Sequence, residues 1–184
     1  MNSTRESDDE RVWVIRARGG DRAAFTRLVD AYDRRLLYFI NRILGDQTAA
    51  FDVLQQVWLT VHRKLHRLQS PCAFRVWLYR IAHDCAVNEI RKKSRRPVPV
   101  ENLENSSEPD QYDAEAAFDN AEIVHLGLER LSTDHRRILT LRFLEEMKVD
   151  DIAQVLGCRD GTVKSRLHYA LRALRMHVEE IERE

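Results

Sequence analysis

The amino-acid sequence predicts an all-α protein made of two small helical domains joined by an acidic flexible linker. Apolar residues recur at three- and four-residue steps over long segments, as in amphipathic helices. Gly and Pro number only 6 and 4 among 184 residues. Charge is segregated as well, because residues 97–123 hold eight acids and no Lys or Arg. We therefore expect a disordered N-terminus over residues 1–17, helical domains over residues 18–96 and 121–184, and a linker over residues 97–120.

Composition and charge exclude several classes of protein. The chain is 43% apolar and 33% charged, and no apolar run approaches the ~18 residues of a membrane span. The first 13 residues are polar and acidic, unlike a secretory signal. Three cysteines lie far apart without a CxxC motif, which favours reduced thiols in a cytoplasmic protein over a zinc site or a disulfide framework. The net charge is zero, but residues 1–96 carry 19 Lys/Arg against 11 Asp/Glu, so the first domain is basic.

Three helices are expected in the first domain. Asp21 is placed to cap a helix through Leu44, and Gly45 to end it. A second helix is expected over residues 48–68. Ser70 and Pro71 signal the start of a third, which reaches about residue 93 and ends in a run of five cations. The apolar stripe predicted for this third helix comprises Phe74, Trp77, Leu78, Ile81, Cys85 and Ile90.

The second domain ends in a helix-turn-helix pattern. Helical periodicity resumes near residue 121, and Ser132 is a candidate cap for the next helix. Residues 149–156 form a short apolar-faced helix, Gly157 a tight turn, and the following residues a long helix. The predicted buried face of the long helix comprises Val163, Leu167, Ala170, Leu171, Leu174 and Val178. Its other face is polar and cationic, which is typical of a helix that reads duplex DNA.

Two stretches resemble a known family. LERLSTDHRRILTLRFLEEMKVDDIAQVLGCRDGTVKSRLHYALRALR resembles region 4 of sigma-70-type sigma factors. FDVLQQVWLTVHRKL followed by FRVWLYRIAHDCAVNEIRKKSRR resembles region 2. Both regions in this order, without further domains, resemble the extracytoplasmic-function (ECF) group. The resemblance implies a specificity subunit of bacterial RNA polymerase: region 2 would bind the clamp of the largest subunit and melt the start-proximal promoter element, and region 4 would read the upstream element and pack on the polymerase flap.

The resemblance assigns candidate residues to each interface. For the upstream element these are Arg159, Thr162, Lys164, Ser165, Arg166, His168 and Arg172. For the melted element they are Arg75, Tyr79, Arg80, Asn88, Arg91, Lys92 and Arg95. Tyr79 lies off the predicted apolar stripe, which makes it the better exposed stacking candidate, whereas Phe74 and Trp77 are expected in the core. For polymerase binding they are Asp52, Gln55 and Gln56.

The chain departs from the family pattern at two places. Phe51 and Gln56 stand where relatives often have acids, which weakens complementarity to a basic partner. Arg159 stands where the family often has a small hydroxyl residue that caps the recognition helix, so Asp160 is expected to take over the cap. Base preference is therefore expected to differ from relatives here.

Two alternatives to a sigma factor remain open from the sequence. One is a stand-alone helix-turn-helix regulator, and the other a sigma-like adaptor that no longer engages core polymerase. The FDVLQQVW segment distinguishes a sigma factor from these alternatives, because only a sigma factor needs it to bind the clamp. No catalytic motif, cofactor or metal site is expected. Expected partners are the polymerase core, promoter DNA and an anti-sigma protein.

Overall fold

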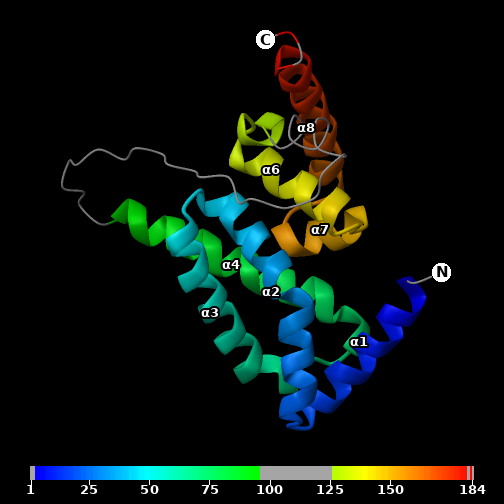
Figure 1. The fold of residues 1–184 in the computed structure, drawn as a ribbon. Helices are drawn as coiled ribbons and strands as arrows, with labels where there is room; N and C mark the ends of the chain where they lie inside the picture. The colour runs from blue at the N-terminus through cyan, green and yellow to red at the C-terminus, as the bar shows by residue number, and fades with distance from the viewer. Residues whose placement is uncertain (1–2, 96–125, 182, 184) are drawn as a thin grey trace. The chain divides into compact units, whose positions relative to one another are not determined.

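A computed structural model of the chain describes residues 3–95, 126–181 and 183. Every element within these ranges is helical, which confirms the predicted fold class. The chain divides into two compact units, residues 1–96 and 97–184 (Figure 1). The acidic segment predicted as a linker lies outside the described residues. Within the described ranges, no helix combines the length and apolar character needed to cross a bilayer.

Helix α2 (Arg22–Leu44) is the centre of the first unit and contacts α1, α3 and α4. Its predicted ends are confirmed. A carboxylate oxygen of Asp21 accepts the backbone N–H of Ala24 at 3.1 Å, and this bond lowers the pKa of Asp21. Gly45 adopts the left-handed conformation (φ 63°), where a Cβ would be strained, and closes the helix. The inward face of α2, including Leu28, Leu36 and Phe39, is buried.

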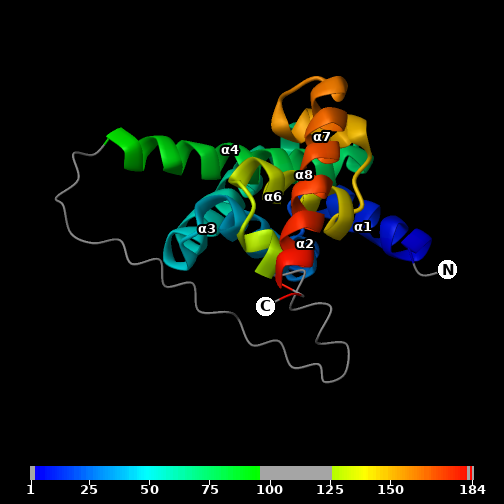
Figure 2. The ribbon, with the colours of Figure 1, turned by 90° about the horizontal axis from the view of Figure 1, so that it is seen from above.

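Two helices and two 3₁₀ turns follow α2 in the first unit. Helix α3 (Gln47–Lys64) is capped by Asp46, and a single 3₁₀ turn, η1 (Leu65–Arg67), continues it. A second 3₁₀ turn, η2 (Pro71–Ala73), begins after Ser70, whose side chain makes no capping bond. Helix α4 (Phe74–Arg95) then runs across α2 and α3, as the two views in Figures 1 and 2 show.

The buried face of α4 differs from the predicted stripe. Tyr79 is 0% exposed, and its ring lies edge-on to Phe39 at a centroid distance of 5.3 Å. Ile90, expected in the core, is 42% exposed. Ala82 and Ala86 are fully buried, and these small residues let α4 approach its neighbours closely. The prediction of an exposed Tyr79 is therefore wrong. The predicted stripe contains only larger residues, whereas Ala82 and Ala86 also belong to the buried face and bring it round to Tyr79.

The predicted disorder of the N-terminus is also wrong for most of its length. Residues Ser3–Arg18 form helix α1, which contacts α2 and both 3₁₀ turns. Val14 is fully buried, and the Tyr32 hydroxyl donates to the carboxylate of Glu10. Burial, followed by the charge of Glu10, raises the pKa of Tyr32. The segment is polar and weakly patterned, so tertiary contacts secure it, among them the buried Val14 and the hydrogen bonds from Tyr32 to Glu10 and from Arg18 to the Gln69 carbonyl.

The second unit is built around the long helix α8 (Asp160–Ile181). Residues 126–129 are helical, and α6 (Thr133–Leu139) follows with the predicted Ser132 cap, whose hydroxyl accepts the N–H of His135 at 3.3 Å. A π-helical turn, η3 (Thr140–Leu144), leads to α7 (Val149–Leu156). Gly157 ends α7 at φ 64°, which confirms the predicted turn.

The packing of α8 confirms most of its predicted face. Val163 and Ala170 are buried, and Leu167, Leu174 and Val178 are partly buried. Leu171 is 44% exposed, contrary to expectation, because it lies on the edge of the stripe. Gly127 lets the helix of residues 126–129 approach α8 closely. A Cβ at this position would lie 3.1 Å from side-chain carbons of Leu174 and Val178.

Candidate nucleic-acid interfaces

The outer face of α4 presents three of the residues predicted to meet melted DNA. Arg80, Asn88 and Arg91 are exposed. At about 100° per residue, Arg80 and Arg91 point within roughly 20° of one another and lie about 16 Å apart along the axis. Neither has an ion pair within the described residues. Two like charges in line on an exposed helix suit a phosphate backbone.

The other predicted residues of this interface lie elsewhere. Tyr79 is in the core, as described above. Arg75 is partly buried, with its Nε atom inaccessible, and its charge acts on Tyr32 from the inward side of the helix. The side chain of Arg95 lies outside the described residues.

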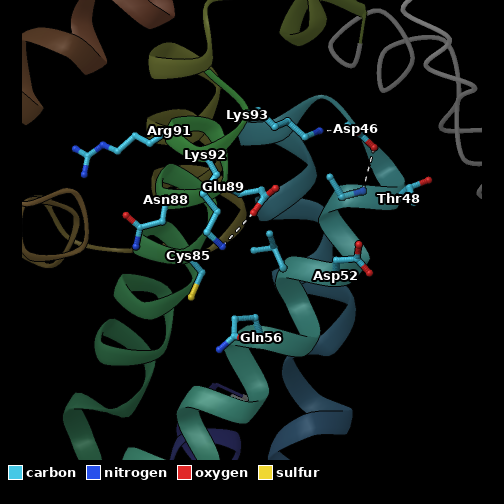
Figure 3. A pocket seen from close by; sticks show the side chains of 12 residues that line it. Asp46, Thr48, Asp52, Gln56, Cys85, Asn88, Glu89, Arg91, Lys92 and Lys93 are labelled. Carbon is cyan, nitrogen blue, oxygen red and sulfur yellow. Dashed lines mark hydrogen bonds and ion pairs between the residues drawn. The ribbon is translucent and has the colours of Figure 1, made fainter. Parts of the chain in front are cut away.

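Two lysines at the end of α4 are engaged by carboxylates. Lys92 lies 3.6 Å from Glu89 in the same helix. Lys93 lies 2.7 Å from Asp46, the residue that caps α3. Figure 3 shows Lys93 pointing toward Asp46 and Arg91 pointing away from α3. The cationic run therefore divides into Arg91, directed outward, and Lys93, which ties α4 to α3.

The outer face of α3 carries the residues predicted to bind polymerase. Asp52, Gln55 and Gln56 are all exposed, and the Gln56 amide donates to the Thr60 hydroxyl at 3.3 Å. Phe51 and Leu59, four residues either side of Gln55, are 46% and 58% exposed. The sequence did not lead us to expect this apolar character. Its signal was present, because Phe51 and Leu59 are not among the regularly spaced apolar residues that α3 buries.

A groove of about 870 Å³ separates α3 from α4 and joins the two candidate interfaces. One wall carries Asp52 and Gln56, and the other carries Asn88, Arg91 and Lys92 (Figure 3). Cys85 lines the groove at mid-height, and burial raises the pKa of its thiol, which disfavours the reactive thiolate. The sequence placed these residues in separate sites, and the fold makes them the facing walls of one groove.

The recognition helix begins at Asp160, so Arg159 occupies the N-cap position and Asp160 the first turn. The expectation that Asp160 caps the helix is therefore wrong. The backbone carbonyl of Arg159 accepts the N–H groups of Thr162 and Val163. Arg159 has no side-chain oxygen to serve as a cap. The carboxylate of Asp160 instead interacts favourably with the positive end of the helix dipole.

The seven residues predicted to meet the upstream element divide between two faces of α8. Lys164, Ser165, His168 and Arg172 are exposed and share the face opposite the buried stripe. Arg159, also exposed, precedes this face at the helix start. Thr162 and Arg166 are partly buried and share one flank. The exposed set matches a surface that meets a DNA groove, with donors for base edges and phosphates, and the Arg166 side chain, 36% exposed, extends from the flank beside it.

Arg166 lies beside an acid that the sequence did not single out. Its guanidinium lies 3.9 Å from Asp134, in the first turn of α6, and the other oxygen of the same carboxylate lies 2.8 Å from Arg137. Asp134 would have been hard to find from the sequence, because it is separated from Arg166 by 32 residues. The i,i+3 spacing of Asp134 and Arg137 was the only local signal.

Within the described residues, no group of three or more His, Cys, Asp or Glu side chains is placed to hold a metal ion.

Comparison with known proteins agrees with this organisation. Residues 28–96 match the family model described as sigma-70 region 2, and residues 121–174 match the model described as sigma-70, region 4. The RNA polymerase sigma-H factor of Pseudomonas aeruginosa is 36% identical over 182 residues, covering 93% of each chain. The ECF RNA polymerase sigma-E factor of Escherichia coli (strain K12) is 30% identical over 178 residues, covering 90% of this chain and 92% of the relative.

The chain belongs to the sigma-70 family, in its ECF group.

Solved structures of sigma factors share the fold of this ECF chain. The sigma factor RpoE of Bartonella quintana, solved in complex with the anti-sigma factor NepR, aligns with a TM-score of 0.68 at 21% identity and covers 84% of this chain and 96% of its own. CnrH, solved with the cytosolic domain of CnrY, aligns with a TM-score of 0.66 at 21% identity and covers 94% and 98%. At this identity the likeness concerns the fold.

Proposed function

We propose that this ECF sigma factor directs bacterial core RNA polymerase to specific promoters and initiates transcription by recognising and melting DNA. The observation that carries the proposal is the match of regions 2 and 4, in order, within one chain that aligns with named sigma factors over nine-tenths of its length. The protein acts in the cytoplasm as a specificity subunit, with no enzymatic activity or cofactor of its own.

The first unit would carry polymerase binding and promoter melting. Its α3 face offers Asp52, Gln55 and Gln56, and the exposed Phe51 and Leu59 add apolar area beside them. Buried aromatic anchors contribute much of the binding energy of many interfaces, so Phe51 would compensate for the lack of the acids that relatives often have here. The outer face of α4, with Arg80, Asn88 and Arg91, would follow the backbone of the separated strand.

The second unit would read the upstream promoter element through α8. Arg and Lys side chains can form paired hydrogen bonds with guanine, and Ser and Thr can serve several bases. The exposed Lys164, Ser165 and Arg172 satisfy this requirement on one face. We also propose that an anti-sigma protein sequesters the chain by covering the exposed surfaces of the first unit.

Run-off transcription tests the proposed function. The template carries a candidate promoter and the reaction contains bacterial core polymerase with or without the chain. We expect transcripts only when the chain is present, and a several-fold loss with Asp52→Ala. Asp30→Ala is the matched control, because it removes an exposed acid from α2. DNA binding without association with core polymerase would contradict the proposal and support a stand-alone regulator. Core association without transcripts would support an adaptor.

A further inference from the structure

One carboxylate in the second unit lies beside two guanidinium groups from different helices. Asp134 contacts Arg137 at 2.8 Å through one oxygen and Arg166 at 3.9 Å through the other. Arg137 belongs to α6 and its side chain is only 15% exposed, whereas the Arg166 side chain is 36% exposed and extends from the recognition helix. The carboxylate is thus anchored on its own helix and directed at α8.

The first of these pairs orders the Asp134 carboxylate. The i,i+3 spacing, the short distance and the shielding of Arg137 favour one position of it. A free arginine side chain samples many rotamers, and ordering it on binding costs affinity. A carboxylate that already restricts Arg166 removes part of that cost for one orientation of the guanidinium and leaves the others disfavoured.

The negative charge has a second effect on DNA. It offsets the positive charge of Arg166, so it weakens attraction to phosphates, which is the same for every sequence. Restricting the side chain and reducing this non-specific attraction both raise the ratio of two affinities: that for DNA with the correct base pair and that for DNA with an incorrect one.

We propose that Asp134 is a positioning residue for base recognition: it orients Arg166, so that this arginine discriminates between base pairs instead of adding general affinity for DNA. The inference rests on the proposed function of α8 as the recognition helix. It assigns to an acid of α6 a part in promoter choice.

The test uses holoenzyme assembled from the full chain and bacterial core polymerase. A library of duplexes with a randomised upstream element first defines the preferred sequence, and Arg166→Ala then identifies the base pair whose preference depends on Arg166. Competition between the preferred duplex and one changed at that single base pair measures discrimination for each variant. Glu179→Gln is the charge-matched control, since Glu179 lies near the far end of α8 and pairs with Arg183.

We expect Asp134→Asn to reduce discrimination at that base pair by about 2- to 10-fold, the range for ordering one flexible side chain, while affinity for unrelated duplexes stays equal or rises. In the Arg166→Ala background, Asp134→Asn should have no further effect on discrimination. The control should leave discrimination unchanged.

Other outcomes overturn the inference in distinguishable ways. A uniform loss of affinity for all duplexes, with discrimination unchanged and a lower unfolding temperature, would make Asp134 a purely structural residue. An equal loss of discrimination in the Arg166→Ala background would show that Asp134 acts without Arg166. Absence of any sequence preference in the unaltered chain would overturn the proposed function itself, and the inference with it.

Discussion

Lys93 on α4 lies 2.7 Å from a carboxylate oxygen of Asp46, whose other oxygen accepts the backbone N–H of Ala49 at 3.0 Å. One side chain thus caps α3 and ties the cationic end of α4 to it. The bond from Ala49, followed by that from Lys93, lowers the pKa of Asp46 below its ordinary value of 3.8. The contact links the two helices that form the walls of the groove.

Asp46→Asn separates capping from the ion pair. Asn also caps helices well, so the variant loses mainly the pair with Lys93, and a cost below about 1 kcal/mol is expected because both side chains are about half exposed. A lowered pKa stabilises the fold above the unfolded pKa, and that contribution is lost as pH falls through the folded pKa. The difference in unfolding free energy between the variant and the unaltered chain should therefore be present at pH 7 and shrink below pH 3.8.

Urea unfolding followed by tryptophan fluorescence measures this difference in the first unit, because the three tryptophans, Trp13, Trp58 and Trp77, all lie there. Lys93→Met should reproduce the loss at neutral pH. A difference that stays constant from pH 7 to pH 3 would contradict the assigned role of Asp46.

Adjacent residues of α4 should behave oppositely when truncated. Tyr79→Ala removes a fully buried ring that contacts Phe39, and a loss of about 3–5 kcal/mol of unfolding free energy is expected. Arg80→Ala removes an exposed side chain and should change stability by less than about 0.5 kcal/mol. The same Arg80 variant should weaken promoter opening by holoenzyme. A stable Tyr79→Ala protein with impaired opening would instead favour the stacking role that the sequence suggested.

The close approach at Gly127 should make it intolerant of large side chains. Gly127→Leu is expected to destabilise the second unit by about 1–3 kcal/mol, since its first carbon alone would lie 3.1 Å from Leu174 and Val178. Gly161→Leu is the control, because nothing lies within 4 Å of a Cβ there. Hydrogen exchange of the amides of residues 170–178 reports the effect, and equal protection in both variants would refute it.

Helix α1 should contribute to stability through the burial of Val14. Val14→Ala is expected to cost about 2 kcal/mol through lost burial and a residual cavity. Val12→Ala, two positions away on the same helix and 50% exposed, should be nearly neutral. Tryptophan fluorescence in urea compares the two variants. Identical unfolding midpoints would mean that α1 is dispensable to the first unit.

Local signals predicted the helix ends well. Asp21, Ser132 and the two left-handed glycines, Gly45 and Gly157, act within one turn of the chain, so their roles are visible in the sequence. The Asp46 cap was missed although it directly precedes α3. Its signal was present, because Asp is among the preferred N-cap residues.

Tertiary packing decided what the sequence did not reveal. Tyr79 looked exposed because Ala82 and Ala86 were not counted in the apolar stripe, yet these alanines rotate the buried face of α4 toward the tyrosine. Helix α1 has little apolar pattern of its own and depends on its contact with α2. The pairs Asp134–Arg166 and Asp46–Lys93 join residues 32 and 47 positions apart, and no local rule connects such residues.

The proposed activity of the chain is to enable core polymerase to open promoter DNA. Permanganate reactivity of thymines near the transcription start measures strand opening directly, on a promoter selected with holoenzyme. We predict reactive thymines only when core polymerase and the chain are both present, and a marked loss of reactivity with the double variant Arg80→Ala and Arg91→Ala. Unreactive thymines in the presence of both proteins, together with protection of the duplex by the chain alone, would contradict the account.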